Sequence, residues 1–287
     1  MIKYIIRKSV NISERILTES VCDLEMSEEK KIKIFQKGFN YSQDGHGNRL
    51  VFHLQGCNMK CPWCSNPEGM ALNGINMTEK GRTRLSCKEY TIEELVKESV
   101  RSKPMFFDGG GVTLTGGEIS VQFEVVKELL MKLKKENIHT AIETNGSHPR
   151  MEELMPYVEQ WIMDVKHYDE MKHKEWVGVS LENTTKTLKT VSEKHPDILV
   201  RVPLIPGFND SKDDAKNFAC YFVQNIDSNN RSKGNVQVEF LAYHEFGKQK
   251  WEQCGMEYKM PNVRLAPGTV KMFEELMKEY GITCVRT

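Results

Sequence analysis

Residues 51–68 read VFHLQGCNMKCPWCSNPE, and this stretch decides how the rest of the chain is interpreted. Its apolar start predicts a buried strand. A loop with three cysteines, Cys57, Cys61 and Cys64, follows that strand. The spacing C-x3-C-x2-C places three thiols within eight residues. A loop that leaves a strand in this way can wrap round one inorganic centre and direct several sulfurs at it.

The three thiols narrow the choice of metal. Thiolate sulfur is a soft ligand that selects zinc or an iron–sulfur cluster over hard cations. A structural zinc site has four protein ligands, and so does a cubane cluster held by protein alone. Three cysteines leave one metal position open for another ligand, which favours an open-site iron–sulfur cluster. A zinc site completed by a distant histidine and a chance group of reduced thiols remain as alternatives.

Length and charge bound the class of protein. The chain has 287 residues, near the upper limit of a single hydrophobic core, so one large domain is expected. Lys plus Arg and Asp plus Glu both number 40, which gives no general attraction to nucleic acid or to an anionic membrane. No stretch approaches the ~18 consecutive apolar residues of a membrane span. The apolar part of MIKYIIRKSV is also too short for a signal peptide. These features predict a cytoplasmic enzyme.

The other cysteines are scattered and have no CxxC partner: Cys22, Cys87, Cys220, Cys254 and Cys284. In a reducing cytosol such residues are usually small buried hydrophobes. Their spacing predicts no second cluster.

The first part of the chain reads as an appendage. We expect an N-terminal extension over 1–36 and a core domain over 37–287. Within the extension, KYIIR and RILTESV predict short strands, and EEKKIKIFQK at 28–37 predicts a charged helix. A turn-rich segment, FNYSQDGHGNRL, then leads into the first clear strand.

Strands and helices alternate through the remainder of the chain. Strands are expected at 51–55, 112–115, 138–144, 161–165, 198–204, 236–242 and 282–286. Helices are expected from Thr91 onward and at 120–136, 150–157, 181–193, 212–224 and 268–279. This alternation predicts βαβ units and a parallel sheet, either a partial barrel or a doubly wound sheet.

Polar residues follow the carboxyl ends of these strands, where chemistry gathers in both architectures. They include Gly116-Gly117-Glu118, ETNG at 143–146 and His244. Asp164 and Lys166 end the strand at 161–165, and Arg201 lies within the strand at 198–204. The diglycine either lets a ligand approach the backbone or makes a tight connection. Asp164 and Lys166 project to the same face, so they either hold an amino acid's ammonium and carboxylate or form an internal salt bridge.

Glu118, Arg201 and His244 also each have both a functional and a structural interpretation. Glu118 is also explained as a carboxylate at a helix start. Arg201 either binds a ligand carboxylate or pairs with a neighbouring acid. His244 either contacts a ribose or carries a proton, and a lone loop histidine is more often only solvated.

Six ordered motifs resemble a known family. They are SQDGHGNRLVFHLQGCNMKCPWCSNPE, GGGVTLTGGE, ETNG, DVK followed by VGVS, RVPLIPGFND and YHEFGKQKW. The cysteine signature resembles that of radical S-adenosylmethionine (SAM) enzymes. The full set is similar to the activating enzymes of glycyl radical enzymes, of the pyruvate formate-lyase activating enzyme type. The resemblance covers about residues 37–286 and implies a partial (β/α)6 TIM-like barrel, the radical SAM core.

The resemblance implies roles for individual residues. Cys57, Cys61 and Cys64 would ligate three irons of a [4Fe–4S] cluster whose fourth iron is chelated by SAM. The implied cofactor-binding residues are Trp63, Ser65, Gly116, Gly117, Glu118, Asp164, Val165, Lys166, Arg201 and His244. A monovalent cation is implied near Glu143, Thr144 and Asp164. Glu143 stands where that family type has an aspartate, which is a departure from the family's cation site.

The implied reaction is reductive cleavage of SAM to a 5′-deoxyadenosyl radical. The radical abstracts hydrogen from a backbone glycine of a partner glycyl radical enzyme, and reduced flavodoxin or ferredoxin is the implied electron donor.

Ile119 and His46 replace prolines of the family, which affects loop shape. Residues 65–110 contain only Cys87, so no ferredoxin-like insertion is expected. A radical SAM enzyme acting on a small molecule or peptide, and a non-catalytic metal-binding protein, are the alternatives. The partner's identity is not specified by the sequence.

Overall fold

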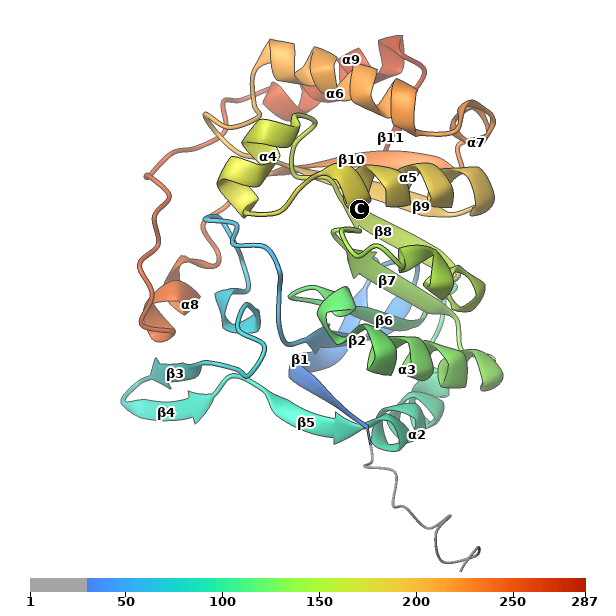
Figure 1. Ribbon diagram of the computed structural model, residues 1–287, viewed down its shortest axis with the longest axis vertical. Helices are drawn as coiled ribbons and strands as arrows, with labels where there is room; N and C mark the ends of the chain where they lie inside the picture. The colour runs from blue at the N-terminus through green and yellow to red at the C-terminus, as the bar shows by residue number, and fades with distance from the viewer. Residues whose placement is uncertain (1–29) are drawn as a thin grey trace, which may run out of the picture. The chain divides into compact units, whose positions relative to one another are not determined.

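The computed structural model describes residues 30–287, and residues 32–287 form one compact unit (Figure 1). Within the described residues the main sheet has nine strands in the order β11-β10-β9-β8-β7-β6-β2-β1-β5. Its parallel centre consists of β2 (Asn48–Leu54), β6 (Gly111–Gly116), β7 (Thr140–Thr144), β8 (Gln160–Asp164), β9 (Ile198–Leu204) and β10 (Val236–Ala242). The predicted strands KYIIR and RILTESV lie outside the described residues.

The sheet is an open barrel. Each central strand pairs in parallel with the next one along the chain, from β2 through to β10. The short β11 (Thr283–Cys284) forms one edge, and β1 (Lys31–Tyr41) with β5 (Lys88–Thr91) forms the other. These edges are not paired with each other in the part of the chain described. The prediction of a partial (β/α)6 TIM-like barrel is therefore confirmed.

Most of the helices follow strands of the sheet, and the longer ones pack against its outside (Figure 1). The longer ones are α2 (Ile92–Ser102), α3 (Phe123–Lys135), α5 (Glu182–Lys194), α6 (Lys212–Asn225) and α9 (Thr269–Glu279). Shorter ones are α4 (Glu170–Val177), α7 (Ser228–Ser232) and α8 (Lys248–Gln253). Short 3-10 helices are η1 (Pro67–Gly69), η2 (Lys103–Met105), η3 (Ile119–Gln122) and η4 (Met151–Tyr157). None of the helices in residues 30–287 has the length and apolar character needed to cross a bilayer.

Local sequence explains where helices begin. Thr91 caps α2 with its hydroxyl accepting from Glu94 N–H, and the Glu94 carboxylate accepts from Thr91 N–H in return. This reciprocal pair is the capping box expected at the start of that helix. The segment at 150–157 was expected to be helical, and it forms the 3-10 helix η4, which contains Pro156. Proline lacks the N–H that an α-helix interior requires.

Residues 28–37 were expected to form a charged helix, and this prediction is wrong for their described part. Lys31–Tyr41 is strand β1, antiparallel to β2. Ile32 and Ile34 are buried and alternate with more exposed residues, which is the two-residue period of a strand. Residues 70–90 include a hairpin of β3 (Asn76–Glu79) and β4 (Arg82–Leu85) before β5.

The turn-rich segment before β2 crosses the interior of the barrel. Its backbone carbonyls at Gln43 and Asp44 accept hydrogen bonds from Arg201 on β9 and Thr113 on β6. The His46 N–H donates to the side chain of Gln160 on β8. Because one short segment binds three different strands, it closes the end of the barrel at which the parallel strands begin.

The role of β1 in the core leads to a stability prediction. Ile34→Ala should lower the free energy of unfolding by ~2 kcal/mol or more, because it removes a buried branched side chain. Gln36→Ala, at an exposed position of the same strand, should stay within ~0.5 kcal/mol of the parent. Urea denaturation under reducing, anaerobic conditions measures both. Equal losses in the two variants would contradict the alternation described for β1.

Candidate active site

One cavity lies at the carboxyl ends of the parallel strands and has a volume of about 290 Å³. Its walls are the cysteine loop and the segments that follow β6, β7, β8, β9 and β10. Most of the residues predicted from the sequence line it: Cys57, Cys61, Cys64, Trp63, Ser65, Gly116, Gly117, Glu118, Asp164, Lys166 and His244. Val165 and Arg201 are not among its lining residues. The fold thus brings together residues that are up to 187 positions apart in sequence.

The cysteine loop is held by backbone contacts and an apolar shell. The Met59 N–H donates to Cys57 Sγ and the Asn66 N–H to Cys64 Sγ, both at 3.4 Å. Met59, Cys61 and Trp63 belong to a separate buried apolar cluster. In that cluster the Trp63 ring packs against Phe208 at 5.0 Å and Trp176 at 5.9 Å. The thiols therefore lie against an apolar cluster, Cys61 buried and Cys57 and Cys64 half-buried, with amide donors directed at two of the sulfurs.

Burial controls the protonation of these thiols. Desolvation raises the pKa of all three, and that of Cys61 reaches about 12 despite the opposing charge of Lys166. Buried thiols with such high pKa values are neutral at pH 7 unless a metal ion deprotonates them. Their chemistry fits metal ligation.

A single-ion site is not formed by these side chains. Within residues 30–287 no group of three His, Cys, Asp or Glu side chains converges on a point that could hold one metal ion. A cubane cluster instead takes one thiolate at each of several separate irons.

Two glycines bring the turn after β6 against the cysteine loop. Gly116 has φ of +120°, and a Cβ there would lie 2.4 Å from the backbone nitrogen of Leu54. A Cβ on Gly117 would lie 2.2 Å from the Gly56 carbonyl oxygen. The Gly117 N–H donates to Leu54 O at 2.9 Å. No side chain fits at either position, so the backbone contact itself requires glycine.

Glu118 fastens this turn to the one after β7. Its carboxylate accepts from Ser120 N–H at 2.9 Å, Thr144 Oγ1 at 2.7 Å and Asn145 N–H at 2.7 Å. The residue is only 1% exposed. Burial raises the pKa of its carboxyl group, and the three donors oppose that effect. Glu118 is therefore a support for the cavity wall.

Asp164 and Lys166 form an ion pair at the end of β8, with 3.0 Å between Oδ2 and Nζ. Both line the cavity, as their i, i+2 spacing predicts. Burial acts to lower the pKa of Lys166, but attraction by Asp164 and Cys61 outweighs it and raises the pKa, so the ammonium is retained. Val165 between them is fully buried in the main core, so its side chain faces away from the cavity.

Arg201 lies behind the cavity wall and is 6% exposed. Its guanidinium pairs with Glu143 at 2.8 Å and Glu239 at 2.9 Å, and also donates to Gln43 O and Thr287 Oγ1. Burial alone would raise the pKa of Glu143, but Arg201 outweighs it and lowers the pKa. Of the two predicted alternatives, pairing with neighbouring acids is the one observed.

His244 lines the cavity from the loop after β10 and stacks on Phe246, with 4.1 Å between ring centroids. Its Nδ1 accepts from the Phe246 N–H at 3.3 Å. Burial lowers the pKa of His244, so the neutral ring is present at pH 7. Nε2 is the remaining ring atom that can bond to a ligand.

The sequence reasoning missed a brace between α8 and the cysteine loop. The Trp251 indole N–H donates to Cys64 O at 2.9 Å. The Lys250 ammonium donates to Asn66 Oδ1 at 2.9 Å and pairs with Glu68 at 2.7 Å. In the sequence, Lys250 and Trp251 appear only as part of the motif YHEFGKQKW, which does not indicate the residues that they contact.

An open α/β barrel with a three-thiol loop beside a polar cavity defines the radical SAM class of protein. A family model described as the Radical SAM superfamily matches residues 51–219. In fold alone, the chain is similar to a radical SAM methyltransferase from Sphaerobacter thermophilus. The two share 14% identity and a TM-score of 0.56, over 91% of this chain and 74% of that one.

Proteins of similar sequence identify the family within this class to which the chain belongs. The pyruvate formate-lyase 1-activating enzyme of Escherichia coli is 33% identical over 245 residues, covering 83% of this chain and 92% of that protein. The 4-hydroxyphenylacetate decarboxylase activating enzyme of Clostridioides difficile is 28% identical over 318 residues, covering 90% of this chain and 98% of that protein. The chain belongs to the glycyl radical enzyme activating enzymes, a family of the radical SAM superfamily.

Membership of this family establishes the activity. The protein is an iron–sulfur enzyme that cleaves SAM reductively with a [4Fe–4S] cluster and activates a glycyl radical enzyme. The predicted resemblance is confirmed, and the alternative of a non-catalytic metal-binding protein is excluded.

The brace on the cysteine loop leads to a prediction for Trp251→Phe. The variant loses the hydrogen bond to Cys64 O, a change of about 1 kcal/mol that frees the loop locally. In the cluster-free protein, iodoacetamide should then alkylate Cys64 faster than in the parent, as measured by mass spectrometry of the Cys64 peptide. In the reconstituted protein the cluster's midpoint potential should shift.

Trp161→Phe is the matched control. The Trp161 indole is fully buried, and its N–H has no hydrogen-bond partner among residues 30–287. Its replacement should leave the alkylation rate of Cys64 unchanged. Equal rates in Trp251→Phe and the parent would show that the indole does not hold the loop.

Proposed function

We propose that Cys57, Cys61 and Cys64 each bind one iron of the cluster, and that the fourth iron takes the amino and carboxylate groups of SAM. The single observation that carries this proposal is the cavity of about 290 Å³ that all three thiols line together with the strand-end residues. The residues proposed to contact SAM are Trp63, Ser65, Gly116, Gly117, Asp164, Val165, Lys166 and His244, with Glu118 and Arg201 supporting them from behind. Val165 contributes through its backbone, because its side chain is in the core.

When bound, the cluster supplies the single electron that splits the sulfonium of SAM. The protein's own groups bind and orient the nucleotide. Asp164 and Lys166 offer opposite charges to the ammonium and carboxylate of the methionine part. His244 offers Nε2 to the ribose, and the apolar cluster around Trp63 keeps water away from the thiols.

The protein substrate is proposed to be a glycyl radical enzyme whose backbone glycine enters the cavity mouth beside His244. Leu241 is 38% exposed and lines the cavity, and Phe246 next to His244 is 81% exposed, which suits contact with a polypeptide loop. The two relatives are named as activating enzymes of pyruvate formate-lyase and of 4-hydroxyphenylacetate decarboxylase. An enzyme of this kind is the proposed partner, and a reduced flavodoxin or ferredoxin is the proposed electron donor. We also propose an extension at 1–36 and a core at 37–287, with partner docking by the part of the extension that precedes β1, because residues from Lys31 onward belong to the sheet.

The monovalent cation near Glu143, Thr144 and Asp164 remains a prediction. All three residues line the cavity, but both carboxylates already have a cationic partner, Arg201 for Glu143 and Lys166 for Asp164. Thr144 donates its hydroxyl to Glu118. A monovalent cation would therefore bind weakly here.

This weak site predicts a weak response to potassium. Reductive SAM cleavage should proceed at similar rates in potassium chloride and in choline chloride of equal ionic strength, because protein cations already offset the carboxylates. The rate of 5′-deoxyadenosine formation, followed by chromatography, measures this. A large loss in choline would instead show that a bound cation is required.

The cluster proposal predicts distinct results for different cysteines. Anaerobically reconstituted parent protein should contain about four irons and four sulfides and should cleave SAM when reduced with dithionite. Cys61→Ala should lose both properties, because it removes the ligand of one iron. With pyruvate formate-lyase as the partner, the parent should also produce a glycine-centred doublet in electron paramagnetic resonance.

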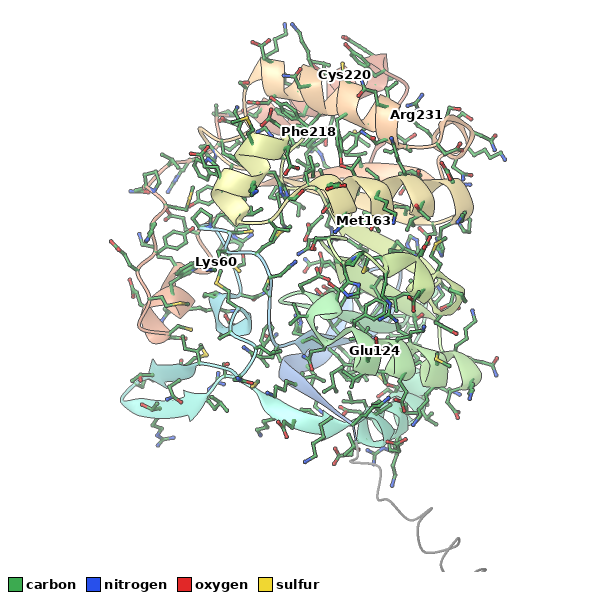
Figure 2. The ribbon with its side chains drawn as sticks, viewed as in Figure 1. Lys60, Glu124, Met163, Phe218, Cys220 and Arg231 are labelled. Carbon is green, nitrogen blue, oxygen red and sulfur yellow. The ribbon has the colours of Figure 1, made fainter. Side chains whose placement is uncertain are left out.

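Cys220→Ala is the control, because Cys220 is exposed on α6, away from the loop that carries Lys60 (Figure 2). It should keep the iron content and the activity of the parent. A fully loaded cluster in Cys61→Ala would refute the ligand assignment.

A further inference from the structure

A second hollow, which we call the outer groove, lies on the other face of the cysteine loop and has a volume of about 420 Å³. Cys57 and Met59 line both the outer groove and the active-site cavity. The loop at 57–59 is therefore the wall that separates the two spaces. A cluster bound by Cys57 would have this wall as its boundary toward the outer groove.

The walls of the outer groove are mainly apolar. Besides Met59 they include Pro62, Met70, Ala71 and Trp251. Trp251 connects the groove to a second thiol, because its indole N–H donates to Cys64 O at 2.9 Å. Two of the three proposed cluster ligands are thus one contact away from the surface of this groove.

The charged residues that line the outer groove are all positive. Its charged lining residues are Lys60 and Lys259, both exposed, and no acidic residue lines it. Neither lysine forms an ion pair with another residue of the described chain. Lys60 lies within the cysteine signature itself and is exposed, so it projects outward from the loop that carries it (Figure 2). Unpaired lysines around an apolar hollow attract a partner with an acidic surface.

The reaction needs a partner of this kind. Each SAM cleavage consumes one electron, and a small apolar contact rimmed by charge is typical of transient electron-transfer complexes. Tunnelling slows steeply with distance, so an electron carrier must approach a cluster ligand closely. It must also leave the cavity mouth near His244 free for the protein substrate. The outer groove meets both requirements.

We propose that the outer groove is the docking surface for an acidic one-electron carrier protein, which binds through Lys60 and Lys259. The carrier is oxidised by one electron, and the cluster is reduced from the 2+ to the 1+ state through Cys57 and Trp251. This inference rests on the cluster assignment proposed above. It adds that electron and substrate reach the cluster from opposite faces of the cysteine loop.

The test compares two reductants for the same reconstituted enzyme. In Lys60→Glu/Lys259→Glu, SAM cleavage supported by a reduced bacterial flavodoxin should fall by about tenfold or more in kcat/KM, because the attraction becomes repulsion. Its dependence on salt concentration should also reverse. With dithionite, which needs no docking surface, the rate and the iron content should match the parent. If the parent protein itself failed to cleave SAM with dithionite, the cluster assignment would be refuted. A failure of the cluster assignment is therefore distinguishable from a failure of the docking proposal.

Lys189→Glu/Lys212→Glu makes the same charge change on exposed positions of α5 and the start of α6, and should leave the flavodoxin-supported rate unchanged. The single variant Lys259→Glu tests the outer groove even if Lys60→Glu disturbs the cysteine loop, because Lys259 lies outside the cysteine signature. An unchanged flavodoxin-supported rate in Lys259→Glu and in the double variant would overturn the proposal. So would a loss of glycyl radical formation with dithionite while SAM cleavage persists, since that pattern would make the groove the protein-substrate site.

Discussion

Two backbone hydrogen bonds join the end of β2 and the start of the cysteine loop to the turn after β6, and they anchor the segment that carries the three thiols. The Gly117 N–H donates to Leu54 O at 2.9 Å, and the Glu118 N–H donates to Gly56 O at 2.8 Å. These bonds extend the pairing of β2 with β6 beyond the end of both strands and into the loop. Because a loop has few regular hydrogen bonds of its own, its shape is set by such contacts with rigid neighbours.

Inside the barrel, charged side chains form a paired network beneath the cavity. The parallel registers place Asp164, Arg201 and Glu239 side by side on β8, β9 and β10. Arg201 is bonded to two carboxylates and two further oxygens, and Asp164 pairs with Lys166, so every charged side chain in this group has a bonded partner. Buried ions require this degree of pairing, since an unpaired one is strongly destabilising. The network gives the cavity a fixed polar floor.

The open side of the barrel gives the cysteine loop two accessible faces. One face borders the cavity, and the other borders the outer groove, with α8 bracing the loop between Glu68 and Cys64. A closed barrel of eight strands would cover more of this edge. In the proposed arrangement, the partial barrel leaves room for two proteins to reach one small centre, while the brace keeps the loop in place.

The sequence by itself determined the parallel sheet, the cysteine loop and the family, because strand periodicity and motif spacing are local properties. Strands β9 and β10 have the predicted limits, and the residues after β6 and β8 line the cavity as expected. The helix expected at 28–37 fails because Ile32 and Ile34 are buried in the main core as alternate residues of strand β1, which pairs with β2. Only the tertiary structure decided that Arg201 pairs with Glu143 and Glu239 and that Trp251 holds Cys64, because those partners are distant in sequence and meet only when the sheet curls.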